Sequence, residues 1–465
     1  MNRPKNIPML LILTVLASSC GGGGGGGGGA GGGGGGGGGE IPTSGSDANA
    51  ANRLTDVTSI AAGGSFNCAL QTDGTSTLVK CWGQNVYNQS GRADTSTNSP
   101  TPNTVQAQTV GPFPTELRGA TAVTAGLNHA CALLTNGKVY CWGRNDSGQI
   151  GNGSQTGVSV HPSVLVKTSA NTDLAGVVGI TAGANHTCAV VGAARRLYCW
   201  GANSHHQQGD AAAAKIYYAT AVVNTTTNAN VDNVTTIAGG VTHTCVLLSS
   251  GQVQCVGSNA FGERGENNNS TTASGEFKTV VSAGPMNTFP ALANMAQIST
   301  SGYTTCTQGT NGRTYCWGYN ANMTLGDEGY TAAQATHART VTYGQGPLPA
   351  STKISVGAQH ACAYMTALAK TVCWGRNAYG TLGTSTTTIP GSSGQPISTL
   401  GPGTNAELTD VLQLALGADH SCALLTTGNV VCWGRTAYKQ TGYQEADAAQ
   451  VAHHERPYYV LKTGG

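Results

Sequence analysis

Cysteine is the residue type whose number and spacing most strongly suggest chemistry in this sequence. Fourteen of the 15 cysteines form seven pairs, and the members of each pair lie 10, 11 or 13 residues apart. Such pairs could bind a metal, shuttle electrons or form structural disulfides. The pairs are Cys68 with Cys81, Cys131 with Cys141, Cys188 with Cys199, Cys245 with Cys255, Cys306 with Cys316, Cys362 with Cys373, and Cys422 with Cys432.

The residues between paired cysteines favour a disulfide. In "HACALLTNGKVYCWG" (129–143), strand-forming residues flank Asn136-Gly137, which is a strong hairpin signal. A three-residue loop with Gly137 at positive φ places Leu133 opposite Val139 and Cys131 opposite Cys141. Opposed residues lie roughly 4.5–5.5 Å apart at Cα, and a disulfide accepts about 4.4–6.8 Å. Zinc sites usually contain closely spaced cysteines and a closed set of four ligands, which this spacing does not provide.

A second candidate group is a histidine two residues before the first cysteine of a pair. Residues i and i+2 of a strand share a face, so each of these histidines neighbours its disulfide. A ring of imidazoles could bind a metal or act as a general base. Repetition in five units favours buried, hydrogen-bonded scaffold residues instead. The five are His129, His186, His243, His360 and His420, whereas Phe66 and Thr304 occupy this position in two other units.

These groups belong to a repeat, because the first cysteines recur every 56 to 63 residues. Each unit contains an apolar strand ending near Gly ("AVTAG", 122–126), the cysteine hairpin, Trp-Gly, a loop such as "NDSGQIG" (145–151) and an extended segment such as "HPSVLV" (161–166). The six tryptophans all precede this loop, and the fourth unit has Val256 instead. About four short strands in each of seven units predict an all-β, seven-bladed propeller of antiparallel blades with disulfides inside them.

The order of these motifs resembles the regulator-of-chromosome-condensation repeat over roughly residues 54–462. The second unit is the closest match, and the third and fifth have looser loops. The resemblance implies a seven-bladed propeller and a histidine before the first cysteine. The paired cysteines are an addition to the family pattern, typical of exported bacterial-looking members.

The N-terminus indicates export. Arg3 and Lys5 precede a short apolar run (9–16), and "LASSC" (16–20) resembles a bacterial lipobox, with Ala17 in place of the usual Leu. We expect a signal peptide over 1–19, cleavage before Cys20 and lipidation of its thiol; the alternative is an ordinary secretory signal. Nine glycines, Ala30 and nine more glycines follow, so residues 20–52 are predicted to form a flexible tether with a span of ~25 Å. The repeats then occupy 53–465. Export also explains the disulfides, which persist in oxidising compartments.

Composition excludes a nucleic-acid interface. Charged residues are only 9% of the chain, and without Arg3 and Lys5 both basic and acidic residues number 21. No basic stripe supplies the electrostatic attraction that nucleic-acid binding needs. We predict no cofactor, no metal site and no nucleic-acid partner.

Binding residues are expected on loops at one rim of the ring. The position five residues after Trp (or Val256) carries Tyr87, Ser147, His205, Phe261, Asn322, Tyr379 and Tyr438. Aromatic residues on a common face suit a binding surface, although each ring could pack inside its own loop. Features peculiar to single units are better candidates, because the scaffold does not require them. The candidate binding loops contain His205, His206, Tyr217, Tyr218, Phe261, Tyr379, Tyr438 and Lys439.

No catalytic motif stands out, so we expect a monomeric lipoprotein of the bacterial cell envelope, at the outer membrane or cell surface. Its propeller would bind a protein or glycan in adhesion or recognition. The alternative is a propeller enzyme acting on polysaccharide or cell-wall material. A third function, guanine-nucleotide exchange, is implied by the best-known family member. An exported, disulfide-bonded protein would not meet such a partner.

Overall fold

The computed structural model describes residues 50–92, 97–108, 115–155, 157–209, 213–384, 392–402, 404–442 and 453–462. The expected signal peptide (1–19) and most of the expected tether, including Cys20, lie outside these residues. The last tether residues form a single turn of 3-10 helix, η1 (Ala50–Asn52). In the described part of the chain, no helix is long and apolar enough to span a membrane.

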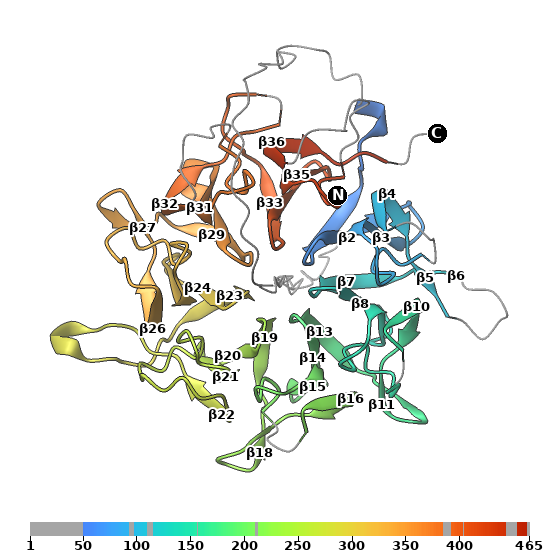
Figure 1. Ribbon diagram of the computed structural model, residues 1–465, viewed down its shortest axis with the longest axis horizontal. Coiled ribbons are helices and arrows are strands. Elements are labelled where there is room, and N and C mark those ends of the chain that lie inside the picture. The colour runs from blue at the N-terminus through green and yellow to red at the C-terminus, as the bar shows by residue number, and fades with distance from the viewer. Residues whose placement is uncertain are drawn as a thin grey trace, which may run out of the picture.

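Seven antiparallel sheets surround a central axis (Figure 1), which confirms the predicted all-β, seven-bladed propeller. Each blade is one continuous segment, and its four strands pair in chain order. The first four blades contain β1 (Val57–Ala62), β2 (Phe66–Thr72), β3 (Thr77–Gln84) and β4 (Asn98–Thr104); β7 (Ala120–Ala125), β8 (His129–Leu134), β9 (Val139–Arg144) and β10 (Ser159–Leu165); β13 (Val177–Ala182), β14 (His186–Val191), β15 (Arg196–Ala202) and β16 (Lys215–Ala221); and β19 (Val234–Gly239), β20 (His243–Leu248), β21 (Val253–Gly257) and β22 (Ser274–Thr279). The last three contain β23 (Met295–Ser301), β24 (Thr304–Gly309), β25 (Thr314–Tyr319) and β26 (Gln334–Thr340); β29 (Ser351–Val356), β30 (His360–Met365), β31 (Lys370–Arg376) and β32 (Ser392–Ser398); and β33 (Val411–Leu416), β34 (His420–Leu425), β35 (Val430–Arg435) and β36 (His453–Tyr459).

Short two-stranded elements lie outside the four-stranded sheets. They are β5 (Gln106–Ala107) with β6 (Thr115–Glu116), β11 (Lys167–Ser169) with β12 (Thr172–Asp173), β17 (Val223–Asn224) with β18 (Ala229–Asn230), and β27 (Thr342–Tyr343) with β28 (Gly346–Pro347). Of these, β5 also pairs in parallel with β10 and so extends the sheet of blade 2. These elements join the outer strand of one blade to the inner strand of the next.

The core lies between neighbouring blades rather than at one central point. One apolar cluster, for example, combines Leu133 of blade 2 with Ile180 and Trp200 of blade 3. All six tryptophans are completely buried. Because each blade face is covered by the next blade, short strands with apolar residues on both faces suffice to build this core.

Blades 7 and 1 close the ring by side-by-side contacts. The Gln413 side chain donates a hydrogen bond to the Ile60 carbonyl (2.8 Å) and accepts one from the Ile60 N–H (3.0 Å). The Leu54 N–H also donates to the Val460 carbonyl at 2.8 Å. Figure 1 shows β2 and β33 on adjacent blades, at the blue and red ends of the colour scale. Closure therefore needs no strand exchange between the first and last blades.

One expectation about the outer strands was wrong. Tyr217 and Tyr218 were expected on a binding loop, but both are half-buried residues of β16. A side chain added at Gly148 of blade 2 would come within 2.7 Å of Tyr217, and one added at Gly153 would collide with Tyr218. The two tyrosines therefore fill the space that glycines leave on blade 2, and packing explains their presence.

Candidate functional site

The seven predicted hairpin disulfides are all present, and each joins the second and third strands of one blade. They link Cys68 to Cys81, Cys131 to Cys141, Cys188 to Cys199, Cys245 to Cys255, Cys306 to Cys316, Cys362 to Cys373, and Cys422 to Cys432. The prediction of seven pairs within seven hairpins is therefore confirmed at all 14 cysteines, and no disulfide joins two different blades.

The geometry of these disulfides differs from the expectation in one detail. Paired cysteines lie directly opposite each other, as predicted, but their Cα atoms are 4.1 Å apart, slightly closer than expected. The sulfurs lie inside the blades, since every paired cysteine is at most 1% exposed. The turn glycine Gly137 has the predicted positive φ of 73°. The cysteines therefore strengthen each blade locally and leave the contacts between blades to other residues.

The five repeated histidines join neighbouring blades. The imidazole Nε2 of His129 in blade 2 lies 2.8 Å from the hydroxyl of Thr187 in blade 3, and His186 reaches Thr244 in the same way at 2.9 Å. Likewise, His243 contacts Thr305, His360 contacts Ser421 and His420 contacts Asn67, at 2.8 to 2.9 Å. In every case the partner is the residue just before the first cysteine of the next blade.

The direction of these hydrogen bonds follows from the second bond that the partner makes. The hydroxyl of Thr187 donates to the backbone carbonyl of Gln149 at 3.0 Å, so its oxygen must accept from Nε2–H of His129. The indole N–H of Trp200 donates to the same carbonyl at 2.9 Å. Ser421 and Trp433 share the carbonyl of Thr381 in the same way. Histidine, hydroxyl, loop carbonyl and tryptophan thus form one network at the blade junction.

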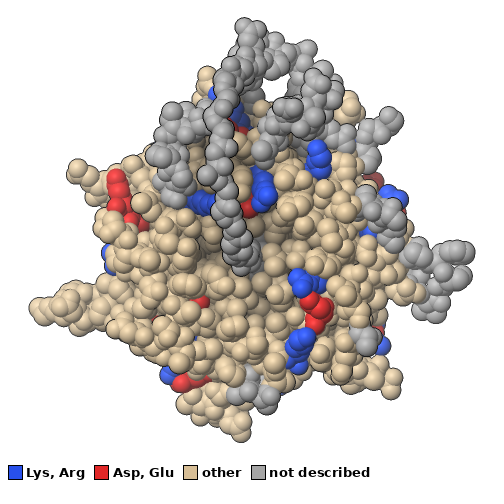
Figure 2. Space-filling model, viewed as in Figure 1, with Lys and Arg blue, Asp and Glu red and all other residues tan. Residues whose placement is uncertain are grey.

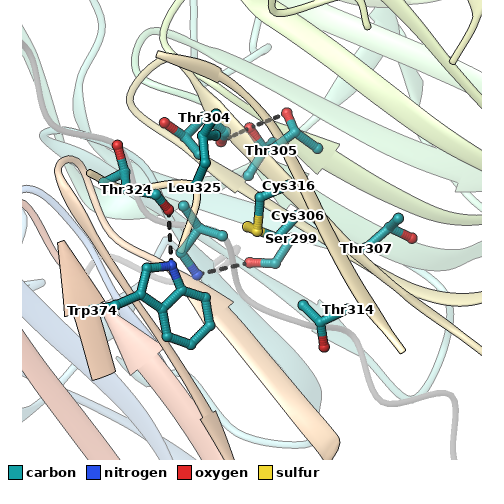
Figure 3. Close-up of a disulfide and its surroundings, with 12 residues drawn as sticks. Ser299, Thr304, Thr305, Cys306, Thr307, Thr314, Cys316, Thr324, Leu325 and Trp374 are labelled. Atoms are coloured by element: carbon teal, nitrogen blue, oxygen red, sulfur yellow. Dashed lines mark hydrogen bonds between the residues drawn. A yellow bond between two sulfur atoms is a disulfide. The ribbon is translucent and has the colours of Figure 1, made fainter. Parts of the chain in front are cut away.

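Figure 3 shows the junction between blades 5 and 6. The indole N–H of Trp374 reaches the carbonyl of Thr324 at 2.9 Å. The hydroxyl of Ser299 accepts a hydrogen bond from the backbone N–H of Val356 at 3.1 Å. The disulfide Cys306–Cys316 lies beside these contacts.

The sequence contained a signal for this network that residue spacing within one blade did not reveal. Where a blade lacks the histidine, the next blade also lacks the polar partner. Phe66 is followed in the next blade by Ala130, and Thr304 by Ala361. Comparing residues across consecutive units, rather than within one unit, would have predicted these contacts.

Burial keeps the histidines neutral. Each is at most 1% exposed, and desolvation lowers the pKa of His186 to about 4 and the pKa of His129, His243, His360 and His420 to about 3. Each ring also lies against the glycine that ends the inner strand. A methyl group added at Gly183 would lie 2.1 Å from the ring of His186. The histidine layer is thus closed to solvent and tightly packed.

A second layer lies at the loops that follow Trp-Gly, and the expected rim residues belong to it. The ring of Tyr379 in blade 6 lies 5.0 Å from the guanidinium of Arg435 in blade 7, and the ring of Tyr87 lies 5.0 Å from the guanidinium of Arg144 in blade 2. Between blades 4 and 5, Phe261 packs edge-on against Tyr319 at 5.2 Å. The aromatic residue therefore packs against the residue after Trp-Gly in the next blade, and not only inside its own loop.

The rim is most elaborate where blades 6 and 7 meet. Arg435 lies between the rings of Tyr379 and Tyr438, and Arg376 lies 5.5 Å from Tyr379. Asp419 pairs with both arginines, at 3.6 Å to Arg376 and 3.4 Å to Arg435. All five side chains are partly exposed. We call this group the blade 6–7 patch.

The other predicted residues are distributed more widely. His205 is exposed beside Ser204, His206 is half-buried, and Lys439 is half-buried next to Tyr438 with φ of 62°. Phe261 also contacts Tyr303 at 5.0 Å. Of the predicted loop residues, the structure therefore groups Tyr379, Tyr438 and Lys439 and leaves the histidine pair on blade 3, across the ring from blades 6 and 7 (Figure 1).

The electrostatic surface is sparse. Figure 2 shows a face on which acidic and basic side chains occur in a few separate groups among uncharged residues. Within the described ranges, no group of three or more histidine, cysteine or acidic side chains could hold a metal ion. The arrangement at the rim suits recognition through stacking and hydrogen bonds.

Sequence comparison identifies the repeats. Models of the regulator of chromosome condensation (RCC1) repeat match residues 57–89, 120–149, 177–207, 234–263 and 411–440, and a second model of this repeat matches 136–190 and 373–424. These matches contain most of the cysteine hairpins, the Trp-Gly segments and the loops that form the two layers.

Similar proteins come from fungi, plants and animals. Protein pim1 of Schizosaccharomyces pombe is 26% identical over 238 residues, which cover 48% of this chain and 41% of pim1. The ultraviolet-B receptor UVR8 of Arabidopsis thaliana is 23% identical over 372 residues, covering 70% of this chain and 79% of the receptor. The match with the first of these relatives thus spans less than half of that protein's length.

Solved structures agree with the fold. Human WBSCR16 superposes with a TM-score of 0.64 at 18% identity, covering 80% of this chain and 88% of that one. Prp20p of Saccharomyces cerevisiae, a structure described with its binding properties to Gsp1p and histones, gives 0.56 at 18% identity, covering 78% and 80%. A fold of this type suits a protein-binding scaffold. Together, the repeats and the fold identify this chain as an RCC1-repeat β-propeller.

Proposed function

We propose that the protein is an exported, lipid-anchored binding protein that recognises a protein ligand through the blade 6–7 patch. The observation that carries the proposal is the partly exposed Arg435 held between Tyr379 and Tyr438. Tyrosine and arginine are among the residues most enriched at the energetic centres of protein interfaces, because they combine apolar area with directional hydrogen bonds.

The geometry of the patch supports binding rather than scaffold work. Two arginines share one carboxylate, so the patch retains one net positive charge, and nearby Lys439 adds another. Its rings and guanidinium groups are already ordered by mutual stacking. Pre-ordered side chains lose little conformational entropy on binding, which favours affinity. A partner segment with an exposed carboxylate and an apolar neighbour fits this surface.

The patch can be tested with matched arginine variants. Surface extracts are passed over the soluble propeller, and the affinity of a captured protein is measured for wild type, Arg435→Ala and Arg339→Ala. Arg339 stacks on Tyr330 at 3.8 Å and pairs with Asp327, so it is the same kind of contact placed on blade 5. We expect Arg435→Ala to weaken binding at least tenfold and Arg339→Ala to leave it unchanged. Equal losses for both variants, with unchanged melting, would contradict the proposal.

The anchor is tested separately. Export and lipidation are supported by the apolar N-terminal run, the lipobox-like "LASSC" (16–20) and the disulfides. Cys20→Ser should move the protein from the membrane fraction to the soluble fraction. Mass spectrometry of the wild type should find a lipid on an N-terminal Cys20. A variant that stays with membranes would show that the anchor is wrong without affecting the binding patch.

A further inference from the structure

The junction between blades 3 and 4 differs from the other six, because Val256 replaces the buried tryptophan. In blade 2 the corresponding space is bounded by Gly151 and Val166, and a methyl group added at Gly151 would lie 2.7 Å from the ring of Trp200. In blade 3 the equivalent boundary is Gly209 and Val222. Here no indole arrives from blade 4.

Phe277 fills only part of the missing volume. A methyl group added at Gly209 would lie 3.2 Å from the Phe277 ring, which reaches it from β22. In blades 3 and 5 the positions equivalent to Phe277 are alanines, Ala219 and Ala338. A phenyl ring from the outer strand thus partly replaces the indole from the third strand, and it offers no N–H group.

A cavity of about 450 Å³ opens beside this altered junction. Its volume is within the range of small-molecule sites, roughly 300–1,000 Å³. Its walls include Cys199, Gly209, Ile216 and Val222, which are apolar, and its outer edge carries exposed threonines. The cavity therefore combines an apolar interior with a polar entrance.

Gln208 supplies an unused hydrogen-bond acceptor in this wall. It is 2% exposed, and its Nε2 donates to the Ala202 carbonyl at 3.0 Å, which fixes the orientation of the amide. Its Oε1 is buried and has no partner. The equivalent residues in blades 2, 5 and 6 are Ile150, Leu325 and Leu382. A buried amide oxygen without a partner is costly, and a ligand that donates a hydrogen bond would remove that cost.

We propose that this cavity binds a flat aromatic group that carries a hydrogen-bond donor, such as an indole. The apolar walls would cover the ring, and Gln208 Oε1 would accept from its N–H. The same chemistry could come from a free small molecule or from a tryptophan side chain of a partner protein. In either case the site is distinct from the blade 6–7 patch.

Ligands that differ in one atom group test the proposal. Binding of indole, 1-methylindole and N-acetyltryptophanamide to the full-length protein is measured by equilibrium dialysis or ligand-observed NMR. 1-Methylindole has the same ring system but no N–H. We expect saturable binding of indole or of N-acetyltryptophanamide at concentrations up to about 1 mM, with 1-methylindole about tenfold weaker than indole. Preference for free indole indicates a small-molecule ligand, and preference for the amide indicates a partner side chain.

Three variants locate the binding. Gln208→Leu should weaken indole about tenfold and leave 1-methylindole unchanged, because it removes the acceptor but restores the residue type of Leu325. Ala221→Phe adds a ring at the cavity wall and should abolish both. The control, Thr340→Phe, makes the equivalent change in blade 5 and should alter neither. Absence of saturable binding by all three ligands, or equal binding to wild type and Ala221→Phe with both proteins folded, would overturn the proposal.

Discussion

Removing the hydroxyl of Thr187 should expose the energetic role of the histidine layer. In Thr187→Ala, the Nε2–H of His129 would remain fully buried and lose its acceptor at 2.8 Å. A buried donor without a partner costs about 1–3 kcal/mol. The carbonyl of Gln149 would lose one donor but keep the indole N–H of Trp200. We therefore expect the free energy of unfolding to fall by about 1–3 kcal/mol, mostly through the histidine.

The natural junction between blades 1 and 2 shows how the defect can be repaired. There, Phe66 and Ala130 occupy the positions of His129 and Thr187. The double variant His129→Phe/Thr187→Ala copies that pair and leaves no unpartnered donor. Its destabilisation should be smaller than the sum of the single effects by roughly 0.5–3 kcal/mol, as expected for residues in direct contact.

Urea unfolding with the disulfides intact measures all four proteins of this cycle. The experiment is run at about pH 8, where the histidines are neutral in both folded and unfolded chains. Near-ultraviolet circular dichroism reports loss of the tryptophan packing between blades. Additive effects, or a Thr187→Ala variant as stable as wild type, would refute the view that these hydrogen bonds hold the blades together.

Three further predictions follow from the same layers. The pKa values of the five buried histidines are lowered to about 3 or 4 from 6.5, so stability is complete above about pH 6.5 and is lost as the pH falls, by ~2 kcal/mol per histidine at about pH 5; urea midpoints across this range check the slope, and a flat profile would contradict the neutral layer. Gly183→Ala should lower the melting temperature sharply because the methyl group meets the His186 ring, whereas Gly329→Ala, with no neighbour within 4 Å, should be neutral. Mild reduction of the disulfides should cost about 2–3 kcal/mol per bond without changing the blade order, as urea titration and circular dichroism would show.

The sequence by itself determined what happens inside one repeat. A turn glycine at the right distance, strand-forming residues on both sides and two cysteines are enough to define a hairpin such as 131–141, because every contact spans only a few residues. The period of these hairpins then predicted seven blades, since each sheet must bury its faces against another. Both predictions needed only short-range geometry and the repeat length.

The tertiary structure decided the contacts between blades. His129 and Thr187 are 58 residues apart, so only ring geometry places their side chains within 2.8 Å. Closure likewise brought Gln413 to Ile60 across 353 residues. The exchange of Phe66 and Ala130 recorded such pairing in the sequence, but its meaning depends on knowing which positions of adjacent blades face each other.

Packing also separated candidates of similar appearance. Tyr217 and Tyr379 are both aromatic residues near the repeat loops, yet Tyr217 packs on Gly148 whereas Tyr379 borders a partly exposed arginine pair. Likewise, Val256 was visible as a missing tryptophan, but not the adjoining cavity or the free Gln208 oxygen. Residue type and spacing fix which groups are available, whereas burial and the partners supplied by distant segments decide which groups remain free to bind a ligand.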